Sequence, residues 1–387
     1  MLRLYRLQDY NFRLVIWLSL LSVMGIVLVT SADPSLRTRQ IFGVIVGMTL
    51  MVILSLIDYS WILNFYWVAY AANAIMLTLV LLFGTSSHGA ARWIEFGGLQ
   101  FQPTETSKIM LIVFFSMYFM RHQFDLSTFK SIVRSILLLA FPLFLIFRQP
   151  DLKNTITITA VFCCLYFAAG ISYAKIGLVL LLVVPTVFGL LFLITQTDLP
   201  IIDDYQKERI MTFLEPENDE YSEDVMQQDN SVMAIGSGQL TGKGFDSSRE
   251  DSVSKGNFIA EVQNDFIFAI AGEEMGFLGC FAIILLQFLV VFECLLTGKR
   301  TKDLSGTLVC TGMGSLVAIQ SFINICVACG ILPNTGTTLP FISYGLTSLV
   351  SMFIGMGFVL NASLQRKTLY GGDLLHERGF TFPADSI

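Results

Sequence analysis

Charged side chains are scarce in this sequence: they make up 14% of the 387 residues, whereas 54% are hydrophobic. Soluble globular proteins carry roughly a quarter charged residues, so this scarcity excludes an ordinary soluble domain and predicts a membrane protein. The polar stretch 1–10 is followed by an apolar run long enough to stay in the membrane, so we expect no cleaved signal peptide.

Histidine and cysteine are too few or too scattered to predict a metal centre. The three histidines lie far apart, and the seven cysteines, an odd number, all lie in apolar segments. We expect the cysteines to act as small hydrophobes and not as disulfide partners. Cys326 and Cys329 have CxxC spacing, but no histidine or second pair lies near them, so we expect no protein-bound metal there.

The apolar residues fall into ten runs of about the length that crosses a bilayer. The runs are 12–29, 41–57, 61–83, 106–120, 133–147, 155–169, 176–194, 266–296, 305–331 and 339–364. This pattern predicts an all-α polytopic membrane protein, a single domain over 1–387 with about ten transmembrane helices. The eighth run contains Gly272, Gly276 and Gly279, so we expect it to tilt or break.

Basic residues are concentrated in the connections on one side of these runs, which predicts that this side is cytoplasmic. They are Arg3, Arg6, Arg13, Arg121, Lys130, Arg134, Lys175, Lys299, Arg300, Lys302, Arg366, Lys367 and Arg378. Both termini, including the tail 365–387, are then cytoplasmic, and 195–264 is one large loop outside the cell between the seventh and eighth runs. The acidic part of this loop, 215–229, is expected to be solvated.

Three carboxylates lie where the large loop meets the eighth run: Asp265 at the boundary, then Glu273 and Glu274 two helical turns later. An acidic residue in a membrane segment is costly and usually faces a cavity, a partner charge or a substrate. We expect Glu273 and Glu274, together with Glu261, to line a cavity. Asp265 precedes an apolar run, so a helix N-cap is the alternative to a functional role for it.

Two segments lack the pattern of a regular helix. The segment 332–348 (LPNTGTTLPFISYGLTS) is uncharged and rich in small polar residues, which fits backbone that lines a cavity and makes Ser343 a cavity-lining candidate. The glycine-rich segment 232–245 holds Lys243. It is not a nucleotide P-loop, because that motif needs Gly where Ser237 stands and Ser or Thr where Gly244 stands.

Charged residues also lie near the start of the fourth run, in 101–108 (FQPTETSK). Glu105 and Lys108 are three residues apart, so they share one helix face and can pair. Inside a membrane such a pair is expected to hold helices together rather than to catalyse. Arg92 lies just before this segment, at the expected outer interface, where basic and aromatic anchors are common.

Taken in order, six segments resemble the motifs of the shape, elongation, division and sporulation (SEDS) family, whose members include RodA and FtsW. They are FQPTETSK, RQPDL, YQKER with FLEP, AIGSGQLTGKGF, NDFIFAIAGEEMGFLG and LPNTGTTLPFISYG. The resemblance covers nearly the whole chain, and YQKER and GKGF favour the RodA branch. Two stretches depart from the family pattern: 260–264 (AEVQN) replaces Pro-Glu-His-Thr, and 345–348 (GLTS) replaces Gly-Gly-Ser-Ser.

The resemblance implies an enzyme of the bacterial cell membrane that polymerises lipid II into glycan strands beside a class B penicillin-binding protein. It implies that Asp265 is catalytic and that Glu105 and Lys108 form the intramembrane pair of the family. An elongation role is expected, and a division- or sporulation-type paralogue with the same chemistry is the alternative. Lipid II, the nascent glycan and membrane lipids are the expected partners, and no nucleic acid is expected.

The implied reaction requires few catalytic groups from the protein. An acceptor hydroxyl attacks a sugar linked to a diphosphate, and one base takes the proton. An α-linked diphosphate that becomes a β-1,4 bond is inverted at the anomeric carbon, so a single carboxylate, Asp265, suffices. Arg92, Arg209 and Lys243 are candidates to hold the diphosphate. A divalent cation such as Mg²⁺ or Mn²⁺ could assist, although no ligand cluster demands one.

Two other functions compete with this one. A lipid II flippase or secondary transporter would also have many spans and intramembrane charges, but the sequence shows no inverted repeat. The other competing function is a non-catalytic scaffold for a membrane partner; substitution of Asp265 would then have no effect. The resemblance also implies that the partner transpeptidase binds the lipid-facing surface of the eighth and ninth runs. Small residues on the ninth run would allow close helix approach there: Gly306, Gly312, Gly314 and Ser315.

Overall fold

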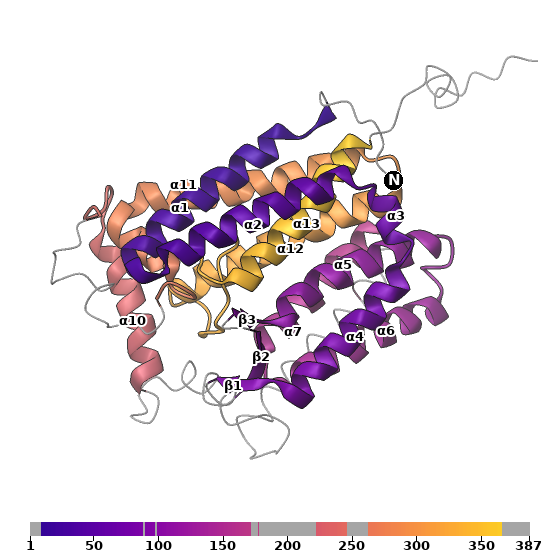
Figure 1. Ribbon diagram of the computed structural model, residues 1–387, viewed down its shortest axis with the longest axis horizontal. Helices are drawn as coiled ribbons and strands as arrows, with labels where there is room; N and C mark the ends of the chain where they lie inside the picture. The colour runs from indigo at the N-terminus through magenta and orange to yellow at the C-terminus, as the bar shows by residue number, and fades with distance from the viewer. Residues whose placement is uncertain are drawn as a thin grey trace, which may run out of the picture.

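The protein is a bundle of long α-helices that lie side by side (Figure 1). The computed structural model describes residues 9–87, 90–96, 99–171, 177, 222–245 and 262–365. The helices are α1 (Phe12–Ala32), α2 (Arg37–Leu56), α3 (Tyr59–Leu63), α4 (Tyr66–Phe83), α5 (Pro103–Arg121), α6 (Phe129–Phe147), α7 (Leu152–Ala168), α10 (Ser222–Ser237), α11 (Ile267–Arg300), α12 (Leu304–Ala328) and α13 (Leu346–Leu364). A 3-10 turn, η2 (Pro34–Leu36), precedes α2.

Seven of the described helices are long and apolar enough to cross a membrane, and they confirm an all-α polytopic membrane protein. They are α1, α2 with η2, α4, α6, α11, α12 and α13. α5 and α7 also coincide with expected runs, but α5 carries buried charges and α7 has 17 residues. The expected seventh run, 176–194, lies outside the described residues apart from Gly177, so the count of ten spans stays a prediction.

The helices form two groups joined mainly through α12, with a further contact between α13 and α5 (Figure 1). One group contains α1, α2, α11 and α13, and the other contains α4, α5, α6 and α7; α12 packs on α11 and α13 in the first and on α5 and α7 in the second. Fifteen of the 19 residues of α5 are buried, so polar groups on α5 face protein and not lipid. A small antiparallel sheet of β1 (Thr85–Ser87), β2 (Ala90–Phe96) and β3 (Leu99–Phe101) leads into α5.

Three of the four small residues predicted on the partner surface, Gly306, Gly312 and Gly314, face inward, so the prediction is wrong for them, whereas Ser315 is half-buried. A Cβ at Gly312 would lie 2.7 Å from the side chain of Ile112 on α5, and one at Gly306 would lie 2.7 Å from the Tyr59 hydroxyl. Gly306, Gly312 and Gly314 are all buried. Lipid is as apolar as a protein interior, so the sequence could not show whether small residues serve a partner or the chain itself.

The acidic part of the large loop is also not as expected. Residues 222–229 begin helix α10, so the prediction of a solvated loop over 215–229 is wrong for them, while 215–221 lie outside the described residues. α10 packs against α11 and α12. The Gln228 side chain donates to the carbonyls of Val327 (2.9 Å) and Leu332 (2.7 Å), and Ser231 donates to Ala328. These tertiary contacts stabilise a helix that composition alone does not favour.

The expected break in the eighth run is confirmed at Gly276, whose φ is 64° and ψ −162°. As one straight helix, the 34 residues of α11 would extend about 51 Å, well beyond a hydrocarbon core of about 30 Å. Before the break, residues 267–274 are buried. After it, the helix exposes a face of large apolar side chains, namely Phe277, Leu278, Phe281, Ile284, Leu285, Phe288, Phe292 and Leu295.

The glycine-rich segment before this break supplies the missing hydrogen bonds. The four bonds join the N–H of Lys243 to the carbonyl of Glu273 (2.8 Å), Gly244 to Glu274 (2.9 Å), Phe277 to Gln239 (2.8 Å) and Leu278 to Leu240 (3.1 Å). A Cβ at Gly238 would lie only 1.9 Å from the carbonyl oxygen of Gly272, so glycine permits this approach. Backbone that leaves the helical pattern at membrane depth needs such partners.

At the opposite end of α11, polar side chains bond to one another. The members of this Asp303 cluster are Ser55, Asp58, Tyr59, Asp303, Asn361 and Gln365. Asp303 caps α12, and its Oδ1 accepts hydrogen bonds from the Gly306 N–H (2.8 Å) and the Tyr59 hydroxyl (2.8 Å). Burial, together with the nearby Asp303 carboxylate, raises the pKa of Tyr59, so the phenol stays protonated and continues to donate.

Candidate active site

Asp265 lies in the turn 262–265, directly before α11, and its side chain is partly exposed. The N-cap position of α11 belongs to Phe266, whose side chain makes no capping hydrogen bond. Asp265 therefore does not occupy the N-cap position that the alternative assigned to it. The neighbours Val262 and Phe266 are both buried, so the turn is anchored by its apolar flanks while the aspartate remains accessible.

The segment 332–345 between α12 and α13 forms the wall beside this turn. It is non-helical, as expected, and much of it is buried, although 346–348 of the expected segment already belong to α13. The expected tenth run, 339–364, is therefore helical only from Leu346. The carbonyl oxygens of the wall accept hydrogen bonds from side chains of the surrounding helices: Gln228 on α10 (to Leu332), Lys153 on α7 (to Gly336), Asn324 on α12 (to Thr337), Gln287 on α11 (to Pro340) and Gln40 on α2 (to Ile342). Five helices thus satisfy backbone groups that a helix would satisfy internally.

Ser343, predicted to line a cavity, instead forms a hydrogen bond within this wall. Its hydroxyl oxygen accepts a hydrogen bond from the N–H of Leu339 at 2.8 Å, and the residue is buried. The neighbouring Tyr344 N–H donates to the carbonyl of Gln263 at 3.0 Å. The wall is therefore bonded directly to the turn that carries Asp265.

Glu105 and Lys108 form the predicted ion pair, with Nζ and Oε2 2.8 Å apart and both side chains buried. Asn154 on α7 joins them, because its Nδ2 lies 3.4 Å from Glu105 Oε1 and 2.8 Å from Asp151 Oδ2. Asp151 also caps α7 and accepts a hydrogen bond from Thr104 at 3.1 Å. The pair therefore binds α5 to α7. The sequence shows Asn154 only as a polar residue in an apolar run.

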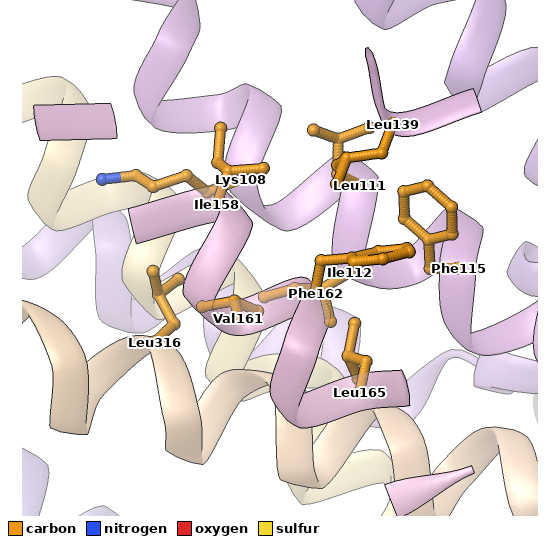
Figure 2. Close-up of a pocket in the computed structure, with 10 residues that line it drawn as sticks. All are labelled: Lys108, Leu111, Ile112, Phe115, Leu139, Ile158, Val161, Phe162, Leu165 and Leu316. Carbon is orange, nitrogen blue, oxygen red and sulfur yellow. The ribbon is translucent and has the colours of Figure 1, made fainter. Parts of the chain in front are cut away.

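A hollow in the described part of the bundle lies beside Lys108 (Figure 2). Its lining is Lys108, Leu111, Ile112, Phe115, Leu139, Ile158, Val161, Phe162, Leu165 and Leu316. In Figure 2 the nitrogen of Lys108 points away from the apolar side chains, so the lysine contributes its hydrocarbon stem to the hollow. The hollow has no group that could take part in sugar transfer.

The acidic residues beyond Asp265 have partners in the structure. Glu273 is almost completely buried and pairs with Lys243, whose Nζ lies 2.9 Å from Oε1. Glu274 is buried and accepts a hydrogen bond from the Ser31 hydroxyl on α1. Both carboxylates lie at the α11 break, so they stabilise the contact of α11 with the glycine-rich segment and with α1.

The other predicted site residues are placed only in part. For Arg92 the structure describes the backbone, within β2, and not the side chain; Arg209 and Glu261 lie outside the described residues. Lys243 is therefore the one predicted diphosphate ligand whose side chain is located. Among the residues that the structure describes, no group of three or more His, Cys, Asp or Glu is placed to hold a metal ion, so no step is derived through a cation.

Comparison with known proteins places this arrangement among cell-wall enzymes. The FtsW/RodA/SpoVE family model, described as "Cell cycle protein", matches residues 5–368. The probable peptidoglycan glycosyltransferase FtsW of Aliivibrio salmonicida is 32% identical over 92% of this chain and 91% of its own. The peptidoglycan glycosyltransferase MrdB of Escherichia coli K12 is 30% identical over 92% of this chain and 94% of its own. A chain of a solved peptidoglycan synthase complex, studied for the coordination of polymerization and crosslinking, is 25% identical with a TM-score of 0.75, over 92% of this chain and 97% of that one.

Proposed function

This chain belongs to the FtsW/RodA/SpoVE family, and from that premise we propose that it polymerises lipid II into β-1,4-linked glycan strands as a peptidoglycan glycosyltransferase. The observation that carries the assignment of the site is the placement of Asp265. It is a half-buried aspartate at the end of a membrane bundle, in a turn bonded to the 332–345 wall and outside the N-cap position of α11.

In the proposed reaction Asp265 is the general base. Its carboxylate takes the proton from the 4-hydroxyl of the acceptor sugar as the hydroxyl oxygen bonds to the anomeric carbon of the donor. The bond from that carbon to the diphosphate oxygen breaks, and the lipid diphosphate leaves with the electron pair. One displacement inverts the anomeric carbon, so no covalent glycosyl-enzyme intermediate is needed.

Arg92, Arg209 and Lys243 are proposed to hold the diphosphate. The geometry of Lys243 supports this role, because its side chain is 21% exposed while its partner Glu273 is only 2% exposed. An anion can therefore approach the ammonium from the open side while Glu273 holds it from within. Each further charge-assisted contact would stabilise the negative charge that develops on the leaving group.

The Asp265 end of the bundle is proposed to face outside the cell. Lys299 and Arg300 lie in the last turn of α11, at the opposite end, and Lys302 follows in the connection to α12; such basic clusters favour the cytoplasm. Cysteines introduced at Asn218 and at Gln123 should label oppositely with an impermeant thiol reagent in intact cells. Labelling at Gln123 but not at Asn218 would reverse this orientation.

A class B penicillin-binding protein is the proposed partner, supported by the likeness to a chain of a peptidoglycan synthase complex. For the cellular role we propose elongation, which the YQKER and GKGF segments favour. Identity to an FtsW and to an MrdB is similar, at 32% and 30%. The role is tested by asking whether the gene restores growth to cells depleted of RodA or to cells depleted of FtsW; restoration only in the latter would assign division.

The function is tested with the full chain purified together with its co-expressed transpeptidase and supplied with lipid II. Glycan strands should form, and Asp265→Asn should abolish them while the variant remains folded and bound to its partner. Lipid II translocation is measured separately in vesicles. Translocation without polymerisation would favour a flippase. Full polymerisation by Asp265→Asn would show that Asp265 is not the general base.

A further inference from the structure

We propose that Asn324 is the positioning residue for Asp265: its amide group fixes the backbone of the aspartate to the 332–345 wall. This inference rests on the proposed function, because it concerns the base of that reaction. Asn324 lies on α12, in the middle of an apolar run, and is completely buried. A buried side-chain amide in a membrane helix is costly unless it is bonded, so its bonds show what it is used for.

The amide of Asn324 uses its nitrogen on two different segments. Nδ2 donates to the carbonyl oxygen of Asp265 at 2.7 Å and to the carbonyl oxygen of Thr337 at 2.6 Å. Both partners are acceptors, so the nitrogen and not the oxygen must face them. The amide oxygen Oδ1 is buried without a partner among the residues that the structure describes. The side chain therefore serves as a double donor, and it does so even though its own acceptor is left unsatisfied.

Two other buried amides provide a comparison. Gln287 donates to the carbonyl of Pro340 at 2.8 Å and Gln40 donates to that of Ile342 at 3.4 Å, and each also has a buried oxygen without a partner in the described part of the chain. These two bond only to the wall. Of the three amides, Asn324 is the one whose bonds also reach Asp265.

The turn that carries Asp265 has one further described tie to the wall, the bond from the Tyr344 N–H to the Gln263 carbonyl. Together the two bonds hold the turn 262–265 at residues 263 and 265. Fixing the carbonyl of Asp265 fixes the direction in which its side chain leaves the backbone. A displacement of about 1 Å in a reacting group can lower a rate about 10²-fold, so this orientation matters for a general base.

The test compares two variants that remove an amide and keep most of the side-chain volume. Asn324→Leu removes both bonds of Asn324, and the control Gln287→Met removes the bond from Gln287 to the same wall. Each is purified with the transpeptidase, and kcat and KM for lipid II are measured. We expect Asn324→Leu to lower kcat about 10²-fold with KM changed less than about threefold, and Gln287→Met to change kcat less than about threefold. If Asn324→Leu does not fold, Asn324→Ser takes its place, because serine is smaller than leucine and fits the buried position. The same loss of kcat is expected.

A double variant separates positioning from general damage. Because Asn324 acts through Asp265, adding Asn324→Leu to Asp265→Asn should cause no further loss of the residual rate. Any of three results would overturn the inference: a further loss in the double variant, an unchanged kcat in Asn324→Leu, or an equal loss of kcat in Gln287→Met. An inactive Asp265→Asn would still support the proposed function in each of these cases. Full activity of Asp265→Asn would instead remove the proposed role of Asp265 itself, and with it the role of Asn324.

Discussion

The two ends of the bundle both bury polar groups, but they differ in how completely those groups are bonded. In the Asp303 cluster, side chains bond mainly to one another, Asn361 also donates to the backbone carbonyl of Ser55, and none of the six residues has a buried polar side-chain atom without a partner in the described structure. At the Asp265 end, side-chain amides bond to the backbone of a non-helical wall, and Gln40, Gln287 and Asn324 each keep an unpartnered oxygen.

This difference indicates what each end is for. A fully satisfied cluster stabilises one arrangement of helices and needs no other explanation. Unpartnered buried acceptors lower stability, and they persist where a site requires a particular backbone shape. Changes to Asp265 or to the bonds that reach it should therefore act on catalysis, whereas changes that affect only the wall or only the Asp303 cluster should act on stability or on nothing measurable.

The largest expected effect comes from making one chemical change at both ends. Asp265→Asn should lower the polymerisation rate about 10²- to 10⁴-fold, because asparagine cannot take a proton. Asp303→Asn should leave the rate unchanged and alter stability by less than about 1 kcal/mol, because asparagine caps a helix about as well as aspartate. Rates per folded molecule and thermal melting in detergent measure both. Equal losses of activity would erase the distinction between the two ends.

The next effect should come from the ion pair within α5. Glu105→Ala leaves the ammonium of Lys108 buried without its carboxylate, which can cost about 3–5 kcal/mol, so folded yield and activity should fall together. The double variant Glu105→Gln/Lys108→Met removes both charges and should recover part of the yield. Glu105→Ala protein that is normally stable but inactive would show that the pair acts in the reaction and not only in the fold.

A smaller effect is expected where the glycine-rich segment contacts α11. Gly238→Ala places a methyl group against the Gly272 carbonyl and should destabilise the protein by about 1–3 kcal/mol. Gly236→Ala is the matched control, because no atom lies within 4 Å of its added Cβ and alanine favours a helix. Melting temperatures distinguish the two. Equal melting temperatures would mean that the close contact is not required.

The smallest effect should come from a single hydroxyl group. Tyr59→Phe removes one donor to Asp303, which keeps its bond from Gly306, so the expected loss of stability is about 0.5–1.5 kcal/mol with activity unchanged. Tyr118→Phe removes a buried hydroxyl that has no partner among the described residues and should cost nothing or stabilise slightly. A larger loss in Tyr118→Phe than in Tyr59→Phe would contradict this account.

Much of the fold follows from the sequence because apolar length and helix-face spacing are local properties. The helices α1, α2, α6 and α12 coincide with expected runs, the break falls at Gly276, and Glu105 pairs with Lys108 as their spacing predicts. The third run starts later as a transmembrane helix, since α3 and a turn precede α4. These features need no knowledge of neighbouring helices.

The features that the sequence does not reveal all depend on a partner far away in the chain. Gln40, Gln287 and Asn324 are visible as polar residues in apolar runs, yet nothing local shows that they all serve one wall. The inward direction of Gly312 is hidden for a similar reason, because lipid and protein offer an apolar side chain the same environment. Helix α10 likewise depends on α11 and α12.

The four backbone bonds across the α11 break have a consequence for protein engineering. Surface loops usually tolerate inserted tags and reporters, and the glycine-rich stretch 238–244 resembles such a loop in its composition. In this protein it completes the hydrogen bonding of a membrane helix, so an insertion there would leave backbone groups of 273–278 without partners. The stretch therefore acts as a hydrogen-bonding partner of the helix that it accompanies, and not as a free surface loop.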